Sequence, residues 1–276
     1  MLEFFTEALQ FDFMRNALLS GLLVSIACGV IGTFVVVNRI VFISGGIAHA
    51  AYGGIGLGYF FGFDPVLGAI GFSLASALGM GAIQRHTEQR ADTLIGVMWA
   101  IGMAIGILFI DMTEGYKADL MSYLFGSILT VPTSDLTIML AIDFVIVALV
   151  VVFYKELLAI SFDPVFATTR NVPVNALYLM LVGAIALTVV MVMQVVGLIL
   201  TIALLTMPAA IAGQFVKDIK QMSILASLLG VLFTTTGLFV SYAFDLTSGA
   251  TIILVSGISY LLSFGLKSLP LSISRA

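Results

Sequence analysis

The feature that most constrains this chain is an apolar stretch of 38 residues, 175–212, that contains no charged side chain. In lipid such a stretch must be helical, because no water is present to satisfy bare backbone groups. A straight helix of that length would measure about 57 Å, nearly twice the ~30 Å thickness of the hydrocarbon core. The stretch must therefore fold back on itself, and Gln194–Gly197 is the only plausible turn.

A second interruption is expected at Met207-Pro208. Proline lacks a backbone N–H and disturbs a helix that it enters, but it suits the first turn of a new helix. We therefore expect the membrane helix to break there and a short helix to run from Ala209 to about Lys220 at the membrane surface. A short surface helix in a transporter is a natural contact point for a cytoplasmic motor. The residues expected to make that contact are Pro208, Ala209, Ala210, Lys217 and Lys220.

Composition places the chain in the membrane. It is 61% hydrophobic and only 9% charged, whereas soluble domains carry about 25% charged residues. The net charge of −4, with scattered basic residues, argues against a nucleic-acid partner. The single cysteine excludes an internal disulfide and a cysteine-based metal cluster. We expect one all-α, polytopic transmembrane domain over residues 1–276, surrounded by lipid, with the segment 208–220 as a coupling helix within it and no cofactor.

The charges between apolar segments predict the topology. Basic residues mark every second boundary between segments, and acidic residues mark most of the others. Because basic residues favour the cytoplasmic side, this pattern predicts an inner (plasma) membrane protein with its N-terminus outside and its C-terminus in the cytoplasm. Eight spans are the alternative if the turn at 194–197 lies inside the membrane. The segment Ala118–Val131 is expected to re-enter the membrane or to lie at its outer interface. The nine expected spans are 15–37, 42–63, 65–83, 93–110, 136–154, 175–194, 196–212, 222–243 and 249–266.

Small residues repeat at helical spacing in two of these spans. Gly54, Gly58 and Gly62 are four residues apart, and so are Gly102 and Gly106. Such faces let membrane helices approach closely. We interpret them as packing seams, and Trp99 as an anchor at a membrane interface.

Several enzyme signatures are missing from the sequence. It has no Gly-x4-Gly-Lys-Ser/Thr motif for ATP, no His-Glu-x2-His and no Gly-x-Ser-x-Gly. Transport across the membrane, driven by an energy source other than ATP bound to this chain, is the simplest remaining activity. Ionisable residues inside the membrane are costly and often functional, and His49 and Asp143 are such residues. His49 either lines a pathway or bonds a backbone carbonyl or water; Asp143 either faces the pathway or pairs with a hydroxyl.

Six segments together resemble the permease family of zinc/manganese/iron ABC importers. They occur in the family's order and cover nearly the whole chain: Gly32–Arg39, Ile47–Ala51, Asp92–Gly96, Asp119–Gly126, Phe162–Ala167 and Val196–Ala212. The resemblance implies a homodimeric permease, two cytoplasmic ATPase subunits and an extracytoplasmic solute-binding protein. It implies import of a divalent transition metal, zinc or manganese and possibly iron, with ATP hydrolysed by the partner. It also implies that the segment after Pro208 docks into the ATPase.

The sequence departs from that family at one position. The family commonly has an Asp four residues before the histidine of the second span, where this chain has Gly45. Asp and His at that spacing would share a helix face and could form a joint metal or proton site. Either another carboxylate replaces it, with Asp143 as the candidate, or the pathway holds metal weakly. Two alternatives stay open: a permease for a chelated metal or siderophore-like ligand, and an ion-coupled secondary carrier with broken helices.

Overall fold

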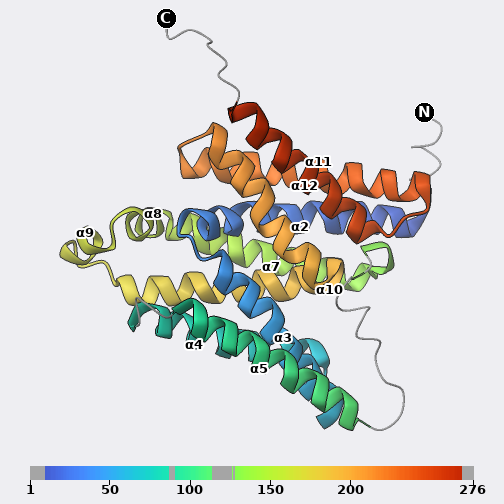
Figure 1. The fold of residues 1–276 in the computed structure, drawn as a ribbon, viewed down its shortest axis with the longest axis horizontal. Coiled ribbons are helices and arrows are strands. Elements are labelled where there is room, and N and C mark those ends of the chain that lie inside the picture. Colours follow the sequence, from blue (N-terminus) through green and yellow to red (C-terminus); the bar gives the residue numbers. More distant parts are fainter. Residues whose placement is uncertain (1–9, 87–90, 114–125, 127, 269–276) are drawn as a thin grey trace, which may run out of the picture.

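The chain forms a bundle of long helices with two short ones projecting at one end (Figure 1). The computed structural model describes residues 10–86, 91–113, 126 and 128–268. Its helices are α2 (Asp12–Val37), α3 (Val41–Phe61), α4 (Pro65–His86), α5 (Ala91–Met112), the 3-10 turn η1 (Ile128–Thr130), α7 (Thr133–Val152), α8 (Tyr154–Phe162), α9 (Pro164–Thr169), α10 (Val174–Phe215), α11 (Ile219–Phe244) and α12 (Ser248–Ser268).

The 42-residue α10 is two helices joined at Gly197. Gly197 has φ 77° and ψ 169°, a backbone conformation closed to residues with a Cβ. The two halves of α10 run in opposite senses along the bundle (Figure 1). Among the described residues eight helices are long and apolar enough to cross a membrane. Because α10 contributes two segments, the nine apolar segments expected from the sequence are present, and the turn expected at 194–197 is confirmed.

The break expected at Met207-Pro208 is wrong. α10 continues through Pro208 and ends at Phe215, and Val216 is extended with φ −125° and ψ 146°. α11 then begins at Ile219, where the Asp218 carboxylate accepts a 2.9 Å hydrogen bond from the Gln221 N–H. The helix expected from Ala209 to Lys220 is therefore two helix ends and a tight turn. A proline inside a membrane helix removes one hydrogen bond, whereas a break would leave several backbone groups without partners.

Close approaches between small residues hold the helices together, as expected for four of the five glycines named from the sequence. A Cβ at Gly58 would lie 2.6 Å from the Cα of Pro65 at the start of α4, and one at Gly102 would lie 2.8 Å from the Cα of Ala50. Gly54 and Gly106 lie against the backbones of α4 and α3. Gly62 differs: it ends α3 in the left-handed conformation, with φ 73° and nothing within 4 Å of its Cβ position.

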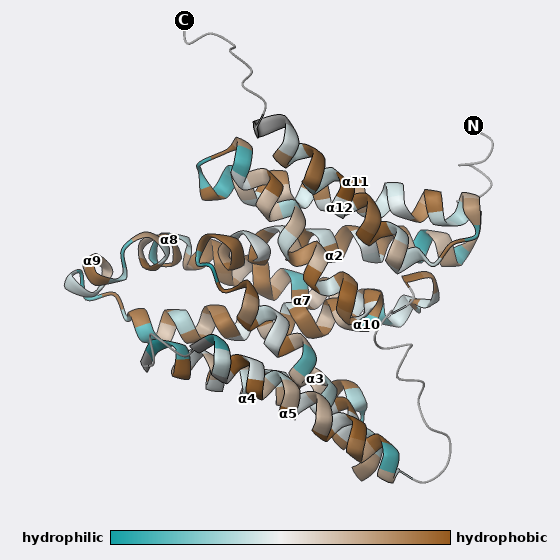
Figure 2. Cartoon of the chain, viewed as in Figure 1, coloured by the Kyte–Doolittle hydropathy of each residue, from teal (hydrophilic) through white to brown (hydrophobic). Residues whose placement is uncertain are grey.

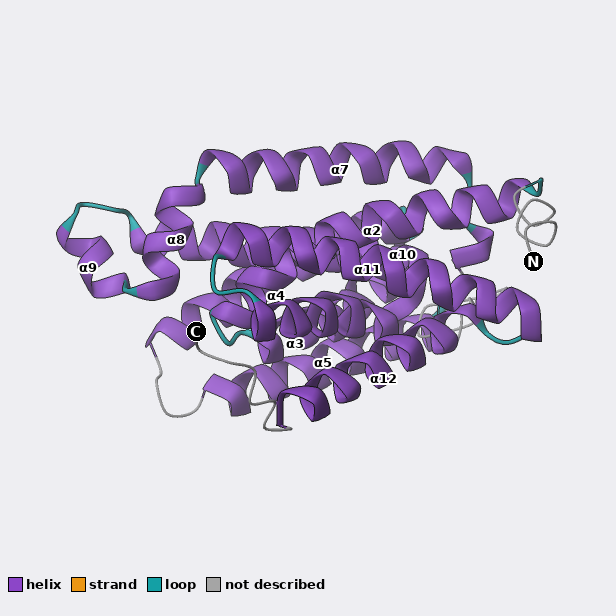
Figure 3. Cartoon of the chain, turned by 90° about the horizontal axis from the view of Figure 1, so that it is seen from above, coloured by secondary structure: helices purple, strands orange, loops and turns teal. Residues whose placement is uncertain are grey.

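α2 lies at the centre of the bundle. It packs against α7, α10 and α11, whereas α3 packs against α4 and α5. Seen from above, α7 and α5 lie on opposite sides of the α2 and α10 layer (Figure 3). Hydrophilic residues gather at helix ends and loops, and the sides of the bundle are apolar (Figure 2). This distribution suits a bundle surrounded by lipid.

The residues expected to form a re-entrant segment are only partly described. Residues 114–125 and 127 lie outside the described part of the chain, so that expectation for Ala118–Val131 stays a prediction. Gly126 itself, with φ 61°, packs against the break in α10, and a Cβ there would lie 2.7 Å from the Val196 carbonyl oxygen. The Asn16 side chain donates a 3.1 Å hydrogen bond to the Val131 carbonyl and ties this segment to α2.

Replacing Gly197 with alanine should destabilise the bundle. A side chain at φ 77° costs on the order of 1–3 kcal/mol, and the neighbouring backbone at Gly126 leaves little room for adjustment. We expect a lower thermal unfolding midpoint and a lower yield of monodisperse protein. Gly71→Ala is the matched control because Gly71 is helical with nothing within 4 Å of its Cβ position. Equal midpoints for the two variants would mean that the bend tolerates a side chain.

Candidate functional site

His49 stands in the middle of α3 and stacks on a tryptophan. Its ring and that of Trp99 in α5 have centroids 4.0 Å apart and planes inclined by 27°. The histidine is half-buried, and its Nδ1 atom is buried with no hydrogen-bond partner among the described residues. The alternative that Nδ1 bonds a backbone carbonyl is therefore not seen. A buried imidazole nitrogen without a partner is costly unless something binds to it.

A cavity of about 400 Å³ opens beside His49. The second half of α10 and one residue of α12 form the rest of its lining: Leu198, Ile199, Ile202, Ala203, Thr206, Met207 and Ile253. Its potential ligand atoms are the imidazole, the Met207 thioether and the hydroxyl of Thr206, which donates a 2.7 Å hydrogen bond to the Ile202 carbonyl. Among the described residues no carboxylate lines the cavity, so the donor set that they provide is neutral.

Gly45 lies about one helical turn before His49, and a Cβ there would point toward Ile202, which lines the cavity. A Cβ at this position would meet only the Cδ1 atom of Ile202 at 3.8 Å and the Cζ3 atom of Trp99 at 4.0 Å. Both are ordinary van der Waals distances. The backbone therefore accepts a Cβ atom without strain at the position where the resembling family has Asp.

Trp99 also lines a shallow groove of about 510 Å³ on the outer face of α5. The other lining residues are Gly96, Ala100, Met103, Ala104 and Ile107. The Trp99 ring packs on His49 and Phe42, and its expected role as an anchor at a membrane interface stays a prediction. His49 lines the cavity, Trp99 lines the groove, and the two rings stack; we call the cavity, the ring pair and the groove together the His49 face.

Asp143 does not belong to the His49 face. It lies on α7, which packs against α2, and the buried thiol of Cys28 is within electrostatic range of its carboxylate. The side chain is 4% exposed, and neither carboxylate oxygen has a hydrogen-bond partner among the described residues. The expected pairing with a hydroxyl is therefore absent from this part of the chain. α2 and α10 lie between α7 and α5 (Figure 3), and Asp143 does not line the His49 cavity. Its expected role as a metal contact stays a prediction.

One end of the bundle carries a projecting hook formed by α8 and α9 (Figure 1). Asp163 caps α9 by accepting a 2.9 Å hydrogen bond from the Phe166 N–H, and Pro164 occupies its first turn. Ala167 is buried and anchors α9. Two apolar side chains on α9 are instead open to the surroundings: Val165 is 75% exposed and Phe166 54%.

Of the residues expected to contact the ATPase, some are buried in the structure and others are exposed. Ala209 is fully buried within α10, and Pro208 is buried as well. Ala210 is half-buried. Lys217 is exposed in the turn between α10 and α11, whereas the side chain of Lys220 lines a groove between helices. The exposed residues of the segment 208–220 therefore lie from Gly213 onward, and contact with a motor through this segment stays a prediction.

The whole chain matches known transport proteins. The model of the ABC 3 transport family matches residues 10–267. This chain belongs to the ABC 3 transport family. It is 64% identical over 267 residues to the "Uncharacterized membrane protein slr2045" of Synechocystis, covering 97% of this chain and 95% of that protein. It is 35% identical to the manganese transport system membrane protein MntC of Listeria monocytogenes, covering 95% and 93% of the two chains.

A solved structure agrees with the fold. The structure "PsaBC from Streptococcus pneumoniae in complex with Fab" matches with a TM-score of 0.86 at 33% identity, over 95% of each chain. The resemblance to metal-importer permeases is therefore confirmed, and the chain is a transport permease subunit of the metal type.

Proposed function

We propose that this permease imports a divalent transition-metal ion and that the ion passes the His49 face. The observation that carries the proposal is the unpartnered, buried Nδ1 of His49 at a cavity whose other potential donors are a thioether and a hydroxyl. Imidazole suits zinc, iron and other late transition metals, whereas manganese prefers oxygen ligands and would bind here only weakly. Manganese is the first candidate, because the similar protein MntC is named for manganese transport.

A neutral donor set favours passage over retention. Without a carboxylate, a divalent ion at His49 keeps most of its charge uncompensated, so it binds weakly and can leave. Nitrogen and sulfur donors also bind several first-row metals in the same general order of affinity. We therefore place the choice between manganese, zinc and iron in a separate extracytoplasmic binding protein.

The His49 face is also the surface that we propose a second copy of the chain covers. A groove lined by Gly96, Ala100 and Ala104 lets two α5 helices approach closely. A homodimer through this face would bring two His49 side chains to one central pathway. The cargo would then meet two imidazoles in place of one.

We propose that the end of the bundle with α8 and α9 faces the cytoplasm. Described basic residues gather there: Arg39, Lys155, Arg170, Lys217 and Lys220, and basic loops favour the cytoplasmic side. The exposed Val165 and Phe166 on a capped, anchored helix then suit a docking contact for the ATPase subunit, two copies per dimer. Lys217 in the adjacent turn would contribute to the same contact.

Reconstitution of the full transporter tests this class of function. The permease, its ATPase and its binding protein are placed in proteoliposomes, and uptake of Mn²⁺, Zn²⁺ and Fe²⁺ is measured with and without ATP. ATP-dependent uptake of a divalent metal is expected. Uptake that persists without the ATPase and collapses when the ion gradient is removed would identify a secondary carrier. Uptake of a chelate but not of the free ion would favour a chelated-metal permease.

Introducing aspartate at Gly45 should strengthen metal binding at the His49 face. A Cβ at the position meets its neighbours at ordinary van der Waals distances, and the carboxylate would share a helix face with His49. A carboxylate about 4 Å from a cation contributes several kcal/mol even at an effective dielectric constant of about 20, so affinity should rise at least about tenfold. Titration of the purified complex with Mn²⁺ measures this, with Gly45→Asn as the uncharged control. Equal affinities in Gly45→Asp and Gly45→Asn would show that a metal ion does not approach this point.

A further inference from the structure

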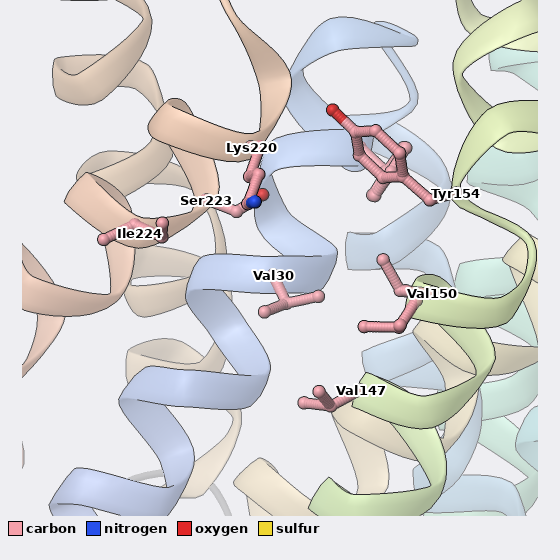
Figure 4. Close-up of a pocket in the computed structure, with 9 residues that line it drawn as sticks. Val30, Val147, Val150, Tyr154, Lys220, Ser223 and Ile224 are labelled. Carbon is pink, nitrogen blue, oxygen red and sulfur yellow. The ribbon is translucent and has the colours of Figure 1, made fainter.

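A groove of about 410 Å³ lies between three helices, away from the His49 face. Its floor is α2, with Val30 and Phe34, and one wall is α7, with Val147, Val150 and Val151. The other wall is the start of α11 (Figure 4). Nearly all of this surface is aliphatic. The neighbouring Leu228 on α11 is 62% exposed, so the groove opens onto the apolar side of the bundle.

The polar side chains of the groove are confined to one end. Lys220 and Ser223 come from the first turns of α11, and Tyr154 is the first residue of α8, just after α7 ends. Figure 4 shows the lysine and the tyrosine at the same end, with Val147 farthest from them. From Val147 to Tyr154 the helical rise is about 10 Å. The groove is thus apolar along most of its length and polar at the end near Lys220 and Tyr154, which we call its mouth.

Lys220 brings a positive charge to the mouth of the groove. No acidic side chain lines the groove, and Lys220 forms no ion pair with any residue in the described ranges. Lys155 and Lys217 are exposed nearby at the same end of the bundle. The Asp218 carboxylate accepts the N–H of Gln221 as the helix cap of α11.

We propose that this groove binds an anionic glycerophospholipid. One acyl chain lies along Val147, Val150 and Val30, and Lys220 binds the phosphate with hydroxyl donors from Tyr154 and Ser223. Basic pockets between membrane helices at the cytoplasmic side recognise anionic headgroups. A second copy of the chain would instead have to bury Lys220 with no carboxylate in the groove to pair with it. The proposal rests on the proposed orientation of the bundle and not on the identity of the cargo.

Native mass spectrometry of the purified full chain tests the proposal. The probes are phosphatidylglycerol and phosphatidylcholine with identical acyl chains. Wild type should bind phosphatidylglycerol in preference, and Lys220→Gln should lower that binding about fivefold without changing phosphatidylcholine. Lys217→Gln is the matched control: it removes the same charge three residues away, from a side chain that does not line the groove, and should change binding less than twofold.

A second variant tests the apolar part of the groove independently. Val147→Phe fills it without altering charge, and it should lower the binding of both lipids while the ATPase still copurifies. Unchanged phosphatidylglycerol binding in both variants would overturn the proposal. If Val147→Phe lost the dimer while lipid binding was unchanged, the groove would be a contact with a second copy of the chain. If Lys220→Gln lost the ATPase while lipid binding was unchanged, the groove would be a contact with the ATPase. Either result would also overturn it.

Discussion

Replacing Val165 with aspartate is expected to separate the permease from its ATPase while leaving the bundle folded. Val165 is 75% exposed, so its change disturbs no packed core. α9 is held in shape by the Asp163 cap and by buried Ala167, both of which the substitution leaves intact. A charge placed at the centre of an apolar contact removes at least about 2 kcal/mol of binding, or about 30-fold in affinity.

Copurification of the ATPase and ATP-driven uptake are the measurements for Val165→Asp. Val165→Leu keeps the apolar contact and should retain both. Leu246→Asp is the control for charge itself, because Leu246 is 54% exposed in the loop at the opposite end of the bundle. If Val165→Asp bound the ATPase as wild type does, the contact would have to be sought elsewhere at this end, with Lys217 as the next residue to change.

Replacing His49 with alanine should lower metal uptake by at least about tenfold while expression and thermal stability stay near wild type. The substitution removes the one imidazole of the His49 cavity, and each lost ligand of a transition-metal site costs on the order of tenfold or more. The bundle should tolerate it, because the Nδ1 atom has no hydrogen-bond partner to leave behind among the described residues. Initial rates of Mn²⁺ uptake by the reconstituted transporter give the comparison.

Asp143→Asn is the matched control for His49→Ala. It also changes a buried ionisable residue within a membrane helix, but one that lies between α7 and α2. Asp143→Asn should leave uptake within about twofold of the wild-type rate, because the proposed pathway does not pass Asp143. If Asp143→Asn abolished uptake and His49→Ala did not, the pathway would run on the other side of α2.

The sequence predicted the class, the number of apolar segments and the position of the bend at Gln194–Gly197, because lipid thickness and backbone hydrogen bonding limit the length of a membrane helix. It could not rank Gly197 and Pro208 as helix breakers. Proline is the stronger breaker in water, where a freed carbonyl bonds the solvent. In a bundle that excludes water, the glycine supplies the one backbone conformation that turns the chain, and the proline stays inside a helix.

Part of the candidate site was predictable and part was not. His49 could be singled out because an ionisable residue inside a membrane span is costly and usually has a functional role. Trp99, Thr206 and Met207 could not, since their meeting with His49 depends on how α5 and the second half of α10 pack on α3. The projecting hook formed by α8 and α9 was also missed. Its signal was present in Phe162-Asp-Pro-Val-Phe-Ala167, where a cap, a proline and exposed apolar residues are combined.

The most direct test of the proposed pathway is to locate the cargo in the assembled transporter. The full complex is arrested with a non-hydrolysable ATP analogue, crystallised with Mn²⁺ and examined by anomalous scattering at the manganese edge. We predict a manganese peak beside the imidazole of His49, in the cavity that Thr206 and Met207 line. A peak at Asp143, between α2 and α7, with none at His49 would contradict the pathway proposed for this permease.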